Sequence, residues 1–119
     1  MRLNEVSYPD GTPVEGYGPG FFRVGGKVIT GGLLILPKAE PCVWGGYTDA
    51  APLLAEAGRV DVLFIGTGAE MAHIPADLRD ALDAIGIGVE VMASPAACRT
   101  YNVLLGEGRR VGLAARPVA

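Results

Sequence analysis

The second half of this chain alternates short apolar runs with segments of helical spacing, and this alternation limits the fold more than any other feature. The apolar runs lie at 60–65, 87–92 and 110–115. Strands that alternate with helices favour a parallel sheet with helices packed against it. We therefore predict a βαβαβ unit in which the strands at 60–65 and 87–92 are parallel neighbours, joined by a helix that begins after Pro75.

The first third of the chain has a different pattern. Two apolar runs flank Gly25-Gly26, which predicts a β-hairpin over 21–30. The continuous apolar run Leu33–Leu36 indicates a strand buried on both faces. Residues 37–47 are rich in Pro and Gly and are predicted to form a loop, whereas residues 1–15 are polar and are predicted to be a loosely held arm.

These elements fit one α/β domain over residues 1–119, because that length is typical of a single domain and 50% of the residues are hydrophobic. A short helix with Leu53 and Leu54 is expected after a cap at Thr48 or Asp49. We predict a three-layer α/β/α sandwich with a central mixed sheet, in which an antiparallel N-terminal hairpin precedes the βαβαβ unit.

Composition excludes several function classes. The net charge of −3 argues against nucleic-acid binding, and two cysteines with one histidine make a metal site improbable. No apolar run approaches the roughly 20 residues of a membrane span, and the first residues lack the apolar core of a signal peptide. We expect a cytoplasmic bacterial protein with no cofactor.

Charge is distributed unevenly along the chain. The segment 70–90 is acidic, and the segment from Arg99 onward carries Arg109, Arg110 and Arg116 against Glu107. This pattern has two interpretations: ordinary solvated helix faces and surface arginines, or a basic edge that meets an acidic partner.

The predicted sheet brings two polar segments to one edge, where open α/β sheets bind their ligands. Gly66-Thr67-Gly68 follows the strand at 60–65, and Ser94-Pro95 opens the helix after the strand at 87–92. Ser94 is expected to cap this helix. Free N–H groups at its start, together with Arg99 and Asn102, would suit a carboxylate or phosphate. The alternative is that Ser94 is only a cap and Arg99 pairs with Glu90.

Other constellations favour structural roles. Gly66-Thr67-Gly68 resembles the start of a dinucleotide-binding turn, but Met71 stands in place of the third glycine. Cys98 lies early in the helix after Ser94, and a small buried thiol is a simpler interpretation than a nucleophile. Trp44 either plugs the core or is exposed as an anchor for a protein partner.

The order and spacing of several segments resemble a known family. These segments are Gly16–Phe21, Trp44, Leu63–Gly68, Gly88–Met92, Ala97–Leu104 and Glu107–Arg109. The chain resembles the small α/β family that includes mitochondrial respiratory complex I assembly factor 3 and bacterial and archaeal relatives of unknown function.

The resemblance implies a three-layer sandwich around a mixed sheet. The mitochondrial member is a scaffold in complex I assembly with no established catalytic activity. The family motif maps onto Gly66, Thr67, Gly68, Arg99, Tyr101 and Asn102, without a catalytic role to carry over. It therefore favours a non-enzymatic assembly or scaffold factor with a protein partner, associated peripherally with membrane protein complexes. The alternative is a small-anion or small-molecule binding domain, with or without catalysis.

Within the helix after Ser94, Tyr101 and Asn102 lie on different faces. We expect Tyr101 to be buried against the sheet and Asn102 to make a specific hydrogen bond to a loop.

Overall fold

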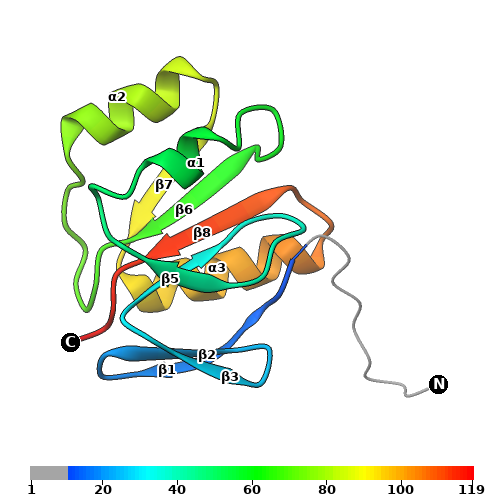
Figure 1. The fold of residues 1–119 in the computed structure, drawn as a ribbon, viewed down its shortest axis with the longest axis vertical. Helices are drawn as coiled ribbons and strands as arrows, with labels where there is room; N and C mark the ends of the chain where they lie inside the picture. The colour runs from blue at the N-terminus through cyan, green and yellow to red at the C-terminus, as the bar shows by residue number, and fades with distance from the viewer. Residues whose placement is uncertain (1–10) are drawn as a thin grey trace.

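The computed structural model describes residues 11–119, and a five-stranded mixed sheet lies at its centre (Figure 1). The strand order is β5-β4-β8-β6-β7. The strands are β4 (Gly32–Ile35), β5 (Cys42–Trp44), β6 (Val62–Gly66), β7 (Gly88–Met92) and β8 (Val111–Ala115). β6 is parallel to β7 and β8, whereas β4 is antiparallel to β5 and β8. The predicted parallel pairing of the strands at 60–65 and 87–92 is confirmed, with Val62 opposite Gly88.

The central strands are apolar throughout because both faces of the sheet are covered. Along β4, Leu33 and Ile35 pack into one core and Leu34 packs into the other. Along β6, Phe64 belongs to the first core and Ile65 to the second. Successive side chains of a strand point to opposite faces, so a continuous apolar run serves two cores.

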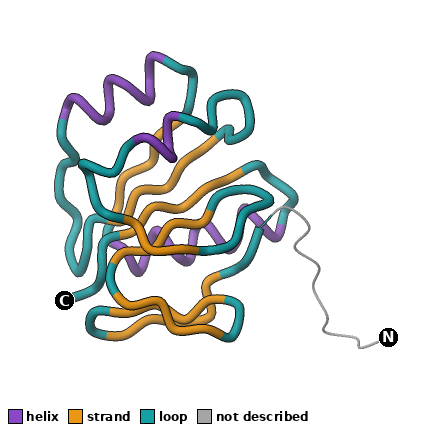
Figure 2. The backbone as a smooth tube through the Cα atoms, in the orientation of Figure 1, coloured by secondary structure: helices purple, strands orange, loops and turns teal. Residues whose placement is uncertain are grey.

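Three helices form the outer layers. α1 (Ala51–Leu54) and α2 (Ala76–Ala84) lie on one face of the sheet, and α3 (Ser94–Gly106) lies on the other (Figure 1). The backbone trace shows the same arrangement, with strands between two helical layers (Figure 2). The predicted three-layer α/β/α class with a mixed sheet is confirmed. Within residues 11–119, no helix combines the length and apolar character needed to cross a membrane.

A second, three-stranded sheet packs beside α3. It consists of β1 (Val14–Gly18), β2 (Phe21–Val24) and β3 (Lys27–Thr30) in the order β1-β2-β3. The predicted hairpin is therefore present as β2 and β3. Its turn requires glycine, because Gly25 and Gly26 both have positive φ, 59° and 77°. Phe22 and Val24 join the core beneath α3.

Some sequence predictions need correction. The arm was expected to run to residue 15, but Val14 and Glu15 lie in β1, and residues 1–10 fall outside the described part of the chain. The predicted loop at 37–47 contains the edge strand β5, whose three residues are too few to show a period. The N-cap residue of α1 is Ala50, whose methyl group cannot cap the helix. The predicted cap Asp49 lies one residue earlier, and its carboxylate accepts a hydrogen bond from the Gly45 amide (2.9 Å).

Candidate functional site

The carboxyl ends of β6 and β7 bring Gly66-Thr67-Gly68 beside Ser94, as the sequence predicted. Ser94 is fully buried, and its hydroxyl connects two segments. Its Oγ accepts a hydrogen bond from the Gly68 amide (2.9 Å) and donates one to the Arg116 carbonyl (2.6 Å). The Ser94 amide donates in turn to the Gly68 carbonyl (2.8 Å). Ser94 therefore ties the turn after β6 to the residues after β8.

Thr67 is also used internally. Its hydroxyl donates to the Glu70 carbonyl (2.7 Å) and accepts from the Ala72 amide (3.1 Å). Its own amide donates to the Met92 carbonyl (2.9 Å). These bonds hold the loop between β6 and α2 against β7, so the polar groups of Thr67 are committed to the fold.

Gly66 is required for a close approach rather than for a ligand. A Cβ built on Gly66 would lie 2.6 Å from Ser94 Oγ and 2.9 Å from Ser94 Cα. Separations this short are not tolerated by carbon atoms, so a side chain would push the start of α3 away from β6.

The start of α3 also differs from the prediction. The N-cap residue is Ala93, Ser94 is the first helical residue, and no side chain caps the helix. The Ser94 hydroxyl is hydrogen-bonded to the Gly68 amide and the Arg116 carbonyl, so it does not cap the first turn of α3. The Ser94 amide is bonded and Pro95 has no N–H, so few first-turn donors remain for an anion.

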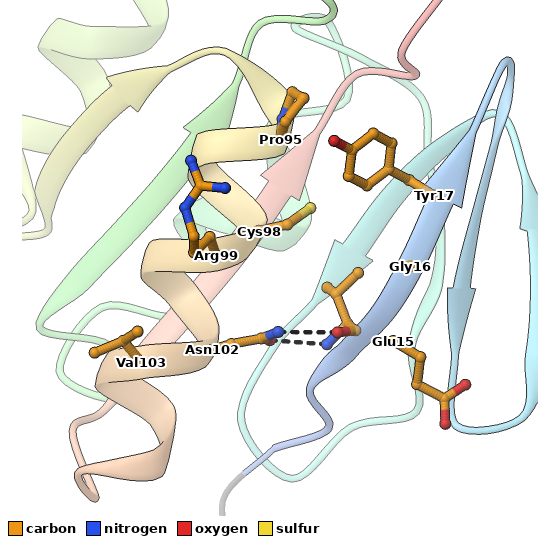
Figure 3. A pocket seen from close by; sticks show the side chains of 9 residues that line it. Glu15, Gly16, Tyr17, Pro95, Cys98, Arg99, Asn102 and Val103 are labelled. Carbon is orange, nitrogen blue, oxygen red and sulfur yellow. Dashed lines mark hydrogen bonds between the residues drawn. The ribbon is translucent and has the colours of Figure 1, made fainter.

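Arg99 and Asn102 do not lie at the Gly66–Gly68 turn but beside β1. Asn102 pairs its side-chain amide with the backbone of β1: Oδ1 accepts from the Val14 amide (2.8 Å) and Nδ2 donates to the Val14 carbonyl (2.9 Å; Figure 3). Asn102 thus makes the specific bond that was expected, but to an edge strand rather than a loop. Its carboxamide occupies the positions that a neighbouring strand would fill.

Tyr101 is fully buried, as predicted. Its hydroxyl donates to the Thr12 carbonyl (3.0 Å), so the ring fills the core while its polar end fastens the chain entering β1.

A groove of about 280 Å³ lies between β1 and α3, next to the Asn102–Val14 pair (Figure 3). In Figure 3, Cys98 and Asn102 extend from α3 toward β1, and Tyr17 stands on β1 opposite Pro95. The groove is lined by Val14, Glu15, Gly16, Tyr17, Pro95, Cys98, Arg99, Asn102 and Val103. Glu15, Tyr17 and Val103 are not predictable from the sequence as neighbours, because only the packing of the three-stranded sheet on α3 brings them together.

Arg99 is exposed at this groove. The ion pairs recorded among residues 11–119 are Arg59–Glu56 and Arg110–Asp61, so the weighed pair between Arg99 and Glu90 is not formed there. Arg99 thus lines the groove with no ion pair recorded for it among residues 11–119.

Cys98 is buried at the base of the groove. Burial raises the pKa of its thiol from 9.0 to about 12, so the thiol is protonated at neutral pH. A protonated thiol is a poor nucleophile, which agrees with the interpretation of Cys98 as a structural residue.

Trp44 is only 3% exposed. Its Nε1 donates to the Asp49 carbonyl (3.0 Å), and its ring meets Tyr47 edge-on at 5.9 Å. Trp44 therefore plugs the core beneath α1, and its ring is not presented to a partner as an anchor.

The chain has relatives among known proteins. The sequence matches the family described as protein of unknown function (DUF498/DUF598) over residues 14–115, from the start of β1 to the end of β8. The chain belongs to this family. An uncharacterized protein of Rhodobacter capsulatus is 48% identical over 118 residues, covering 99% of this chain and 94% of that protein.

More distant relatives carry a functional name. NADH dehydrogenase (ubiquinone) 1 alpha subcomplex assembly factor 3 of Danio rerio is 33% identical over 115 residues. The match covers 90% of this chain and 65% of the zebrafish protein, so slightly less than two thirds of that relative is represented here. The family resemblance inferred from the sequence is thereby confirmed.

Solved structures show the same fold. An outer membrane protein from Bartonella henselae superimposes with a TM-score of 0.83 at 32% identity, covering 95% of this chain and all of that chain (100%). A Bordetella pertussis protein described as an Mth938-like domain gives a TM-score of 0.76 at 26% identity, covering 98% and 91% of the two chains.

Proposed function

We propose that this chain is a non-enzymatic protein-binding domain that assists the assembly of respiratory membrane complexes, and that it binds through the groove between β1 and α3. The assembly role is suggested by the name of the Danio rerio relative. The binding surface is argued from the groove itself.

One observation carries this proposal: two exposed large hydrophobic side chains line the groove. Five large hydrophobic residues are exposed among residues 11–119, and two of them, Tyr17 (47%) and Val103 (55%), line it. Arg99 lies beside them. Tyr and Arg are enriched where protein partners bind, because each offers a large contact area with a polar end.

The chemistry of the groove supports binding rather than nucleophilic catalysis. Its thiol, Cys98, is held protonated by burial, which raises its pKa. Its amide, Asn102, is spent on the backbone of Val14. The exposed charge of Arg99 favours a partner surface that presents a carboxylate beside apolar groups.

Site-specific photocrosslinking in the native cell tests the proposal. A benzophenone amino acid is placed at Val103 in the groove, and separately at Val28 on β3 as a matched control. Val28 is exposed to a similar degree (52%) but does not line the groove. We expect the Val103 probe to capture one subunit or assembly partner of a respiratory complex, and the Val28 probe not to capture it.

A second arm tests the charge. Arg99→Glu should abolish the Val103 crosslink, because an acidic group on the partner would then be repelled. Identical crosslinks from both probe positions, or a Val103 crosslink unchanged by Arg99→Glu, would contradict the groove as the binding surface.

A further inference from the structure

Three cationic side chains from distant segments line a small cavity at the edge of the five-stranded sheet where β6 and β8 begin, opposite the Gly66–Gly68 turn. We propose that this cavity binds a phosphate group. It has a volume of about 180 Å³ and is lined by Pro37, Lys38, Gly58, Arg59 and Arg110. We call it the basic pocket. These residues follow β4, precede β6 and precede β8, and the three segments meet where β6 and β8 begin (Figure 1).

Arg110 is held in a fixed orientation. Its Nε and one terminal nitrogen donate to the two carboxylate oxygens of Asp61 (3.2 and 2.6 Å). The other terminal nitrogen donates to the Gly58 carbonyl (3.0 Å). A guanidinium has five N–H groups, so partners among residues 11–119 account for three and leave two for a ligand. An oriented guanidinium suits the oxygens of a phosphate, which it contacts in pairs.

Lys38 has a backbone conformation that its side chain disfavours. Its φ is 60°, and it is the non-glycine residue recorded with positive φ within 11–119. It follows Pro37 in a turn closed by a hydrogen bond from the Ala39 amide to the Leu36 carbonyl (3.3 Å). Glycine or asparagine is usual at such a position. A disfavoured backbone conformation at a charged residue that lines the pocket fits a binding role for this side chain.

The local charge is positive although the chain is acidic. Arg109 lies close enough to help lower the pKa of Asp61, after the larger effect of the Arg110 hydrogen bond. The lining holds three cations, and two of them contact carboxylates: Arg59 contacts Glu56 and Arg110 contacts Asp61. Glu56 contacts Arg59 only at 3.8 Å. Lys38 adds a positive charge with no ion-pair partner recorded among residues 11–119, and on a chain of net charge −3 this favours an anion at this place.

The size of the basic pocket restricts the ligand. Pockets for drug-sized molecules occupy about 300–1,000 Å³. A cavity of about 180 Å³ suits a phosphate group with little attached to it, either a small soluble phosphate or the headgroup of an anionic lipid. The pocket shares no lining residue with the groove between β1 and α3, so the two proposals are independent.

Backbone NMR of the whole chain tests the phosphate site. Inorganic phosphate is titrated into the labelled protein, and we expect saturable shifts at Lys38, Gly58 and Arg59. Lys38→Gly is the informative variant because glycine accepts positive φ. It should melt at the same temperature as the wild type or higher, yet bind phosphate at least about tenfold more weakly, since a charge-assisted contact is lost.

Lys27→Ala is the matched control, because Lys27 is an exposed lysine on β3 outside the pocket. It should leave phosphate binding within about twofold of the wild type, as expected for a distant screened charge. Cosedimentation with phosphatidylglycerol vesicles, compared with phosphatidylcholine vesicles, shows whether the phosphate group belongs to a lipid or to a soluble ion. If the protein binds phosphatidylglycerol vesicles in a Lys38-dependent way but does not bind inorganic phosphate, the ligand is a lipid headgroup. Absence of both, or equal loss in Lys27→Ala and Lys38→Gly, would overturn the phosphate site.

Discussion

The paired hydrogen bonds between Asn102 and Val14 give a sharp test of how α3 holds the small sheet. Asn102→Asp keeps the shape of the side chain but replaces the Nδ2 donor with an oxygen. The hydrogen bond from Nδ2 to the Val14 carbonyl (2.9 Å) is then replaced by a contact between two oxygens. The bond from the Val14 amide to Oδ1 (2.8 Å) is preserved.

The expected cost combines two terms. The lost hydrogen bond contributes about 1 kcal/mol, and the Val14 carbonyl left facing a carboxylate at a partly buried site adds about 1–2 kcal/mol. Asn102→Asp should therefore lower the free energy of unfolding by about 2–3 kcal/mol at pH 7. For a chain of this size, the melting temperature should fall by roughly 6–15 °C.

Titration separates this explanation from a general loss of packing. Once protonated, the carboxyl group introduced by Asn102→Asp could again donate to the Val14 carbonyl. The difference in stability from the wild type should therefore shrink on acidification toward about pH 4 and below. Thermal melts of both proteins from neutral to acidic pH measure this. A difference that is negligible at neutral pH, or that stays constant across the range, would refute the reasoning.

Four further outcomes follow from buried groups and close contacts. Tyr101→Ala should cost about 3–5 kcal/mol in chemical denaturation and Tyr101→Phe only about 1 kcal/mol, and a small loss for the alanine variant would mean that the ring does not support the core. Gly66→Ala should cost about 1–3 kcal/mol because its methyl group meets Ser94, whereas a wild-type melting curve would contradict that contact. A thiol reagent should modify exposed Cys42 in the native protein and reach Cys98 only on unfolding. Because the pKa of Cys98 is raised from 9.0 to about 12, its contribution to stability is complete below pH 9 and is lost as pH rises toward 12, a loss that Cys98→Ala should lack.

Local patterns were sufficient for most of the fold. The glycine pair at 25–26, the doubly buried run at 33–36 and the alternation of strands and helices after Val60 each depend on neighbours in sequence, so they can be recognised without tertiary information. The right-handed crossover then limits the order of parallel strands. The strands β5 and β1 were missed because their pairing partners, not their own residues, define them.

The site depended on tertiary structure for a physical reason. The sequence correctly placed Gly66–Gly68 beside Ser94, since both follow neighbouring parallel strands. It could not show that the polar groups there are bonded to one another and to Arg116, because hydrogen-bond partners 22 and 26 residues apart leave no local pattern.

The two proposed binding places have the same origin. The groove requires β1 to pack on α3 through Asn102 and Val14, which are 88 residues apart in the chain. The basic pocket requires the ends of three separate strands to meet. Periodicity and turn chemistry determined which helices and strands form. Side-chain packing between distant elements decided which polar groups are hydrogen-bonded within the protein and which remain exposed to a partner or ligand.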